Sequence, residues 1–232
     1  MSYDPQKGIG TYTEGETHAA MKARFEPDPA YQEVRCCGYI ADIMRDGKII
    51  EIQTRGFYSM KDKLTAFLKE YDVTVVYPII RNKTLIWVDP LTGEASKPRI
   101  SSKHGRPSDL LGELNGVADF LGNEKFHTRV VLCDSVEYRL LDGWSKDRKK
   151  GSSRQKLLPL VFAEEYSFGS PGDYRSLVPD SLPDPFTRKD LSKALRLTGR
   201  GLYSAYRVLL RLGFIEEAGK KGRTVLYKVV SG

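Results

Sequence analysis

Cysteine and histidine are scarce in this sequence, with three residues of each among 232. Cys36 and Cys37 are adjacent and Cys133 is distant, a spacing that predicts neither a disulfide framework nor a zinc site and favours a reducing, cytoplasmic environment. The longest apolar run, residues 73–80, is far too short to span a membrane, and the first twelve residues lack the apolar segment of a secretion signal. We therefore expect no membrane partner.

Sequence motifs for several common chemistries are also missing. No P-loop, GxGxxG or GxSxG string occurs, so ATP-driven, dinucleotide-dependent and serine-hydrolase activities lose support. The chain is 40% hydrophobic and its apolar residues fall in short periodic runs, which predicts that most of it folds. Its length suits one large domain or two modest ones.

The net charge of +7 lies at one end of the chain. Residues 184–232 hold 11 Lys and Arg against 4 Asp and Glu, whereas residues 1–183 hold 26 of each. A basic unit on a neutral body favours a polyanionic partner, most simply nucleic acid, and a solvated basic surface is the competing interpretation. A second basic run, at residues 145–156, predicts an exposed loop along a phosphate backbone, with contacts from Arg148, Lys149 and Lys150.

Residues 186–232 are expected to form two helices followed by a short hairpin. Thr187 and Asp190 match a helix N-terminal cap, and a second helix over about 200–212 ends at Gly213. Two short strands, 214–217 and 224–229, follow with a basic turn between them. This order resembles a winged helix-turn-helix.

The winged-helix resemblance implies that the second helix enters the major groove and that the hairpin touches the DNA backbone. The implied base-reading residues are Arg200, Tyr203, Ser204 and Arg207, and the implied backbone contacts are Lys220, Lys221 and Arg223. Winged helices also serve as protein–protein modules, but the basic excess favours DNA.

Residues 39–53 predict a β-hairpin that opposes two acids. Asp46-Gly47 is a strong signal for a two-residue turn, and the resulting register places Asp42 opposite Glu51. Like charges opposed on one face destabilise a sheet, and alternation puts these two among apolar side chains. A divalent cation, Mg²⁺ or Mn²⁺, would compensate them. The alternatives are a sheet edge where both acids reach water, or a raised pKa on one acid.

The elements around this hairpin run in the order helix (11–26), strand pair, helix (58–71) and buried strand (73–80). With Asp42 followed by Glu51-Ile52-Gln53, this order resembles the PD-(D/E)XK nuclease superfamily over about residues 8–90. The resemblance implies that a glutamate of the first helix, best matched by Glu14, joins Asp42 and Glu51 at a metal. Glu14 also fits a helix-capping box.

Gln53 departs from the commoner family pattern, which has lysine at this position. Glutamine brings no positive charge to the phosphate, so Lys22 on the first helix or Lys63 on the second is expected to supply it. Gln53 would then orient water or the metal shell. His18 shares a helix face with Glu14 and Lys22 and is either a general base or phosphate donor, or a packed structural histidine.

These observations predict an α/β fold with a mixed sheet flanked by helices, restriction-endonuclease-like, plus a small winged-helix domain. Strands at 83–89 and 126–138 and a helix at 108–121 extend the core. The expected domains are 1–168 (core 8–90, extension 91–168) and 186–232, joined by a connector at 169–185 that is rich in Pro and Gly.

The function expected from this arrangement is a Mg²⁺- or Mn²⁺-dependent deoxyribonuclease targeted by its C-terminal domain. The alternative is a catalytically inactive DNA-binding regulator on a nuclease fold, motivated by Gln53 and the basic hairpin. RNA as substrate and a homodimer are both left open.

Overall fold

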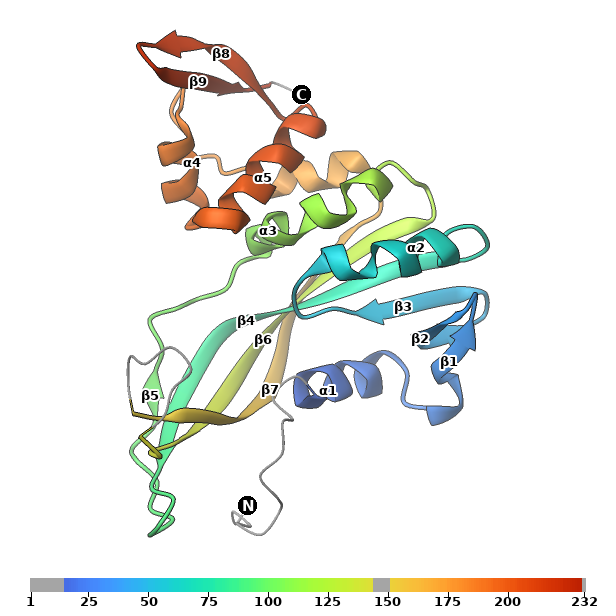
Figure 1. The fold of residues 1–232 in the computed structure, drawn as a ribbon, viewed down its shortest axis with the longest axis vertical. Coiled ribbons are helices and arrows are strands. Elements are labelled where there is room, and N and C mark those ends of the chain that lie inside the picture. The colour runs from blue at the N-terminus through green and yellow to red at the C-terminus, as the bar shows by residue number, and fades with distance from the viewer. Residues whose placement is uncertain (1–14, 144–150, 231–232) are drawn as a thin grey trace.

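Residues 15–143 and 151–230 are described by a computed structural model, in which a seven-stranded mixed sheet is flanked by helices (Figure 1). The sheet order is β1-β2-β3-β4-β6-β7, with β5 paired to the far end of β4. Its strands are β1 (Gln32–Cys36), β2 (Tyr39–Arg45), β3 (Lys48–Ile52), β4 (Asp72–Val88), β5 (Arg99–Ile100), β6 (Phe126–Leu140) and β7 (Ser153–Phe168). The α/β class with a mixed, helix-flanked sheet is therefore confirmed.

The predicted hairpin is present as β2 and β3. Asp46 and Gly47 both have positive φ, 49° and 73°, which is the backbone that a tight two-residue turn requires. Arg45 pairs with Lys48, and the same register continues to Ile43 and Ile50. The hairpin register is thus confirmed over these pairs.

The long strands extend beyond their predicted lengths. The segments 73–80 and 83–89 belong to one strand, β4, which pairs in parallel with both β3 and β6. Strand β7 was not predicted, because Pro159 lies in its middle and register shifts against β6 break the alternation of apolar residues. Strand β1 was also missed, since it is short and lacks buried residues.

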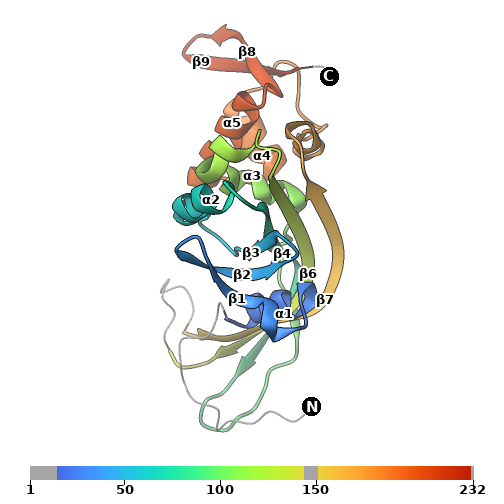
Figure 2. The same ribbon diagram turned by 90° about the vertical axis from the view of Figure 1, so that its right-hand side faces the viewer.

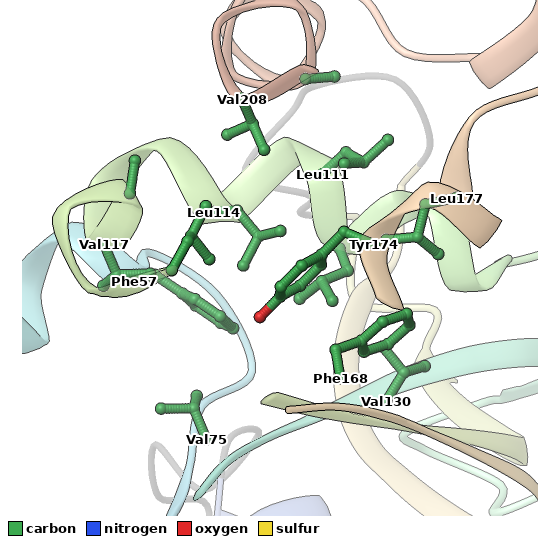
Figure 3. Close-up of a cluster of buried hydrophobic side chains, with 14 of the residues drawn as sticks. Phe57, Val75, Leu111, Leu114, Val117, Val130, Phe168, Tyr174, Leu177 and Val208 are labelled. Atoms are coloured by element: carbon green, nitrogen blue, oxygen red, sulfur yellow. The ribbon is translucent and has the colours of Figure 1, made fainter. Parts of the chain in front are cut away.

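Helices cover both faces of the sheet. Helix α1 (Gly15–Phe25) lies beside β6 and β7 in Figure 2, and its Met21 is buried in a small cluster with Ile43, Ile52, Val76 and Val131. On the other face, α2 (Lys61–Phe67) and α3 (Leu111–Leu114) pack over the main core. Figure 3 shows part of that core, where Phe57, Leu114 and Tyr174 converge above Val75.

The helical segments are more broken than expected. The second predicted helix consists of a 3-10 turn, η2 (Phe57–Met60), and α2. The helix predicted at 108–121 consists of η3 (Pro107–Leu110), α3 and η4 (Asn115–Phe120), with a kink at Val117. A Cβ at Gly116 would lie 2.5 Å from the backbone N of Tyr58, so only glycine allows these two segments to approach.

Residues 169–185 are part of the folded core rather than an exposed connector. They contain the 3-10 segment η5 (Pro171–Leu177), in which Tyr174 and Leu177 are buried. The Tyr174 ring stacks on Phe168 at 5.0 Å, and its hydroxyl is 3.0 Å from that of Thr128 on β6. Tyrosine and leucine burial outweighs the Pro and Gly content that predicted a linker.

The C-terminal unit, residues 186–230, has the predicted two helices and hairpin. The elements are α4 (Arg188–Leu195), α5 (Gly199–Arg211), β8 (Ile215–Lys221) and β9 (Thr224–Val229). The capping box of Thr187 and Asp190 is present, and Gly213 ends α5 with a φ of 71°. Among the described residues, no helix combines the length and the apolar character that crossing a membrane requires.

Helix α5 holds this unit against the sheet domain through hydrogen bonds and an ion pair. Ser204 Oγ donates to the carbonyl of Leu111 at 2.8 Å and accepts from the N–H of Asn115 at 3.2 Å. Arg211 also pairs with Asp119 at 3.0 Å. Buried residues of α5 therefore belong to the same core as the helices that cover the sheet.

Candidate active site

A pocket of about 310 Å³ lies at the point where the pairing between β2 and β3 ends. Helix α1 contributes its first turn, the two strands contribute their acids, and α2 contributes a lysine. The lining residues are Gly15, His18, Asp42, Glu51, Ile52, Gln53, Thr54, Arg55 and Lys63. The structure thus brings together five of the residues that the sequence singled out.

Asp42 and Glu51 lie together, although not as a ladder pair. The register ends at Ile43 and Ile50, and beyond it the Asp42 N–H donates to Glu51 Oε1 at 3.2 Å. The Ile52 N–H in turn donates to Asp42 Oδ2 at 2.7 Å. Each acid therefore accepts a backbone hydrogen bond from the opposite strand, which holds both carboxylates at the mouth of the diverging hairpin.

The two acids have different electrostatic surroundings. Burial and the neighbouring Asp42 carboxylate raise the pKa of Glu51 to about 7, against the attraction of Lys63. Burial also disfavours the charged form of Asp42, but hydrogen bonds from His18 and the Ile52 N–H outweigh it and lower the pKa of Asp42. The pair thus keeps one fixed negative charge and one carboxyl that titrates near neutrality.

His18 and Lys63 approach the acids from opposite faces of the sheet. His18 Nε2 on α1 lies 3.1 Å from Asp42 Oδ2, and Lys63 Nζ on α2 lies 2.5 Å from Glu51 Oε2. Lys63 is one of the two lysines, with Lys22, that the sequence offered in place of a lysine at position 53. His18 is held by an acid of the pocket rather than by the core.

Lys22 and Gln53 have other partners. The ammonium of Lys22 pairs with Glu33 at 2.5 Å and does not line the pocket, so its expected role in the site is not supported by the geometry. The Gln53 amide lines the pocket but donates to the carbonyl of Arg55 at 2.6 Å. This bond holds the backbone turn that follows β3.

The donor set of the pocket fits a divalent cation held by two carboxylates. Asp42 and Glu51 repel one another in a polar, open pocket, and Mg²⁺ characteristically takes one or two carboxylates and fills its other positions with water or phosphate. Within 15–143 and 151–230, no group of three or more His, Cys, Asp or Glu side chains is placed to hold a metal. The proposed third ligand, Glu14, lies outside the described residues.

The predicted DNA-binding residues divide into three groups. Ser204 is buried and bonded to α3 and η4, so the prediction that it reads bases is wrong. Arg148, Lys149 and Lys150 lie outside the described residues. The remaining residues are all exposed: Arg200, Tyr203, Arg207, Lys220, Lys221 and Arg223.

Sequence reasoning missed two contributors near the pocket. Arg55 lines it two residues beyond Gln53, and a basic residue at the end of β3 was the available signal. Glu33 lies near Asp42, and the hydrogen bond from Lys22 lowers the pKa of Glu33 against the repulsion of the Asp42 carboxylate. Its position depends on β1, which the sequence pattern did not reveal.

The chain is similar to known sequences over nearly its whole length. A family model described as "Domain of unknown function (DUF8091)" matches residues 15–169, a range that includes every residue lining the pocket. A protein of Treponema pallidum (strain Nichols), described as "Uncharacterized protein", is 32% identical over 227 residues, which is 95% of this chain and 87% of that protein. No solved structure matches the chain.

Proposed function

Because the chain belongs to the DUF8091 family and the family match contains the whole pocket, we propose a function from the chemistry of that pocket: divalent-metal-dependent cleavage of phosphodiester bonds in DNA. The observation that carries the proposal is the buried Glu51, which touches Lys63 and lies beside Asp42 in an open pocket. A carboxyl with a raised pKa, a second acid and a lysine in one pocket are typical of a catalytic site.

Each side chain has a role that its contacts support. Asp42 and Glu51 would hold Mg²⁺ or Mn²⁺, which when bound supplies positive charge to the phosphate and acidifies water. Lys63 places a charge where negative charge develops on the phosphate oxygens. His18, hydrogen-bonded to Asp42, is positioned to move a proton, and Gln53 fixes the turn beside the acids.

The C-terminal unit would bring the DNA to the pocket. Its two helices and hairpin follow the order of a winged helix, and α5 exposes Arg200, Tyr203 and Arg207. Lys220, Lys221 and Arg223 are exposed at the hairpin end, where a backbone phosphate could be contacted.

One observation favours a second candidate, a DNA-binding regulator without catalysis on the same restriction-endonuclease-like fold. Gln53 replaces the expected lysine, and its amide is bonded to the backbone instead of facing a substrate. Such a protein would bind DNA through the same basic residues and leave it intact.

Plasmid nicking tests the proposal. Purified protein with Mg²⁺ or Mn²⁺ should convert supercoiled plasmid to the nicked form, and EDTA should stop it. Glu51→Ala and Asp42→Ala should abolish nicking, while Glu70→Ala, which removes an exposed acid after α2, should retain it. Nicking by Glu51→Ala at the wild-type rate would overturn the assignment. DNA binding without nicking under any divalent metal would establish the regulator instead.

A further inference from the structure

One end of the sheet is basic. We call the ends of β4, β6 and β7, with β5, the distal arm (residues 81–106, 134–143 and 151–157); they lie at the opposite end of the molecule from β8 and β9 (Figure 1). The arm holds 9 Lys and Arg against 5 Asp and Glu, a net charge of +4. The other described residues up to position 183 hold 12 against 18, a net charge of −6. The apparently neutral body is therefore divided into an acidic part and a basic arm.

The centre of the arm is a buried acid surrounded by three cations. The Glu137 carboxylate is fully buried and lies 2.6 Å from Lys83 Nζ, 2.7 Å from Arg139 Nη1 and 3.4 Å from Arg154 Nε. Arg139 is also held by the hydroxyl and carbonyl of Ser152. The cations are thus fixed in place, which prepares them to bind a ligand with little loss of side-chain freedom.

Among the described residues, these three cations share a single carboxylate, which neutralises only one of the three charges. Partly buried cations that lack a counter-charge are costly, and an anion with several oxygens relieves that cost. The side chains of Lys83, Arg139 and Arg154 are 19%, 22% and 45% exposed, so incoming oxygens can reach them. The cluster therefore fits a phosphate group better than it fits a purely structural ion pair.

The arm and the pocket meet at the first turn of α1. Residues alternate along β6, so Glu137 and Arg139 lie on the same sheet face as Val131, which packs with Met21 of α1. Glu16 of α1 pairs with Lys156 of the arm at 3.1 Å, and its neighbours Gly15 and His18 line the pocket. A chain of phosphates on the arm would thus run toward the two acids.

We propose that the distal arm binds the phosphodiester backbone of DNA, centred on Lys83, Arg139 and Arg154, and leads it to the pocket. The site lies in the family domain and is separate from the C-terminal unit. The inference depends on the proposed nucleic acid substrate but not on its cleavage, since an inactive regulator would use the same surface.

Fluorescence anisotropy of the full chain with a labelled 24-bp duplex, in EDTA and over a salt series, tests this. In Lys83→Gln/Arg154→Gln, Arg139 still pairs with the buried Glu137, and a thermal melt checks that the variant folds. We expect this variant to bind about tenfold more weakly near 0.1 M salt, with its log–log salt slope reduced by roughly 2. The control Lys69→Gln/Lys48→Gln makes the same charge change at exposed positions of the acidic body and should bind like wild type.

The outcomes separate this inference from the proposed function. Equal loss of affinity in the arm variant and the control, or no loss in the arm variant, would overturn the arm site even if the protein nicks plasmid. A selective loss in the arm variant of a protein that never nicks would support the arm and refute the nuclease.

Discussion

Lys63 Nζ on α2 lies 2.5 Å from Glu51 Oε2 on β3, so a helix places beside this acid the positive charge that Gln53, the residue after β3, lacks. The resemblance to PD-(D/E)XK nucleases leads one to look for that charge two residues after the glutamate. Here a lysine of α2, Lys63, provides that charge.

Replacing Lys63 should therefore harm nicking far more than replacing Gln53. We expect Lys63→Met to lower the nicking rate about hundredfold, since it removes a charge aimed at the phosphate. Lys63→Arg should retain part of the activity. Gln53→Ala should lose less than tenfold, because its amide bonds to a backbone carbonyl. Time courses of plasmid nicking measure all three, and a larger loss in Gln53→Ala than in Lys63→Met would contradict this division of roles.

The raised pKa of Glu51 makes a prediction about stability without metal. Its pKa is about 7 in the folded chain against an ordinary 4.5, so its favourable contribution is complete below about pH 4.5 and is lost as the pH rises through 7. Glu51→Gln is neutral at every pH and escapes this loss. Relative to wild type, the variant should gain about 3 kcal/mol of unfolding free energy between pH 4.5 and pH 8.5.

Urea denaturation in EDTA at several pH values measures this difference. Glu70→Gln alters an exposed glutamate, so its stability relative to wild type should change little over the same range. A Glu51→Gln difference that stays flat from pH 4.5 to 8.5 would show that the Glu51 carboxyl titrates normally.

Local signals predicted the parts of the fold that local chemistry determines. The Asp46-Gly47 turn fixed the hairpin, and the Thr187–Asp190 capping box fixed the start of α4. Two lysines, Lys22 and Lys63, were predicted as alternatives for the cation beside the acids. The choice between them depends on how α2 packs against the sheet, and Lys63 is the one that contacts Glu51. Register predicted that Asp42 and Glu51 meet, but not that side chain-to-backbone bonds replace the ladder between them.

Long-range packing accounts for what the sequence did not show. Gly116 lies within the segment predicted as one helix, and its lack of a side chain lets η4 approach the backbone of Tyr58. Nothing within residues 108–121 indicates a contact with Tyr58, which lies 58 positions before Gly116 in the chain. Ser204 likewise matched a recognition-helix position, and only the tertiary contact with α3 identifies it as structural.

The close approach at Gly116 can be tested with a matched pair of glycines. Gly116→Ala would place its Cβ 2.5 Å from the Tyr58 nitrogen, so we expect a loss of about 3 kcal/mol of unfolding free energy. Gly122→Ala meets nothing within 4 Å and should be close to neutral. Urea denaturation compares the two variants, and equal stability would mean that η2 and η4 are not in close contact at Gly116.

Helix α5 should separate into a structural side and a DNA-binding side. Ser204→Ala leaves the Leu111 carbonyl and the Asn115 N–H without their partner, so we expect a loss of about 1–2 kcal/mol of stability and unchanged DNA affinity. Arg207→Gln, on the exposed side, should keep its stability, bind duplex DNA about tenfold more weakly and reduce the salt slope by about 1. Thermal melts and anisotropy measure both quantities. If Ser204→Ala lost affinity while Arg207→Gln did not, α5 would not present this face to DNA, and the winged-helix mode of binding would have to be abandoned.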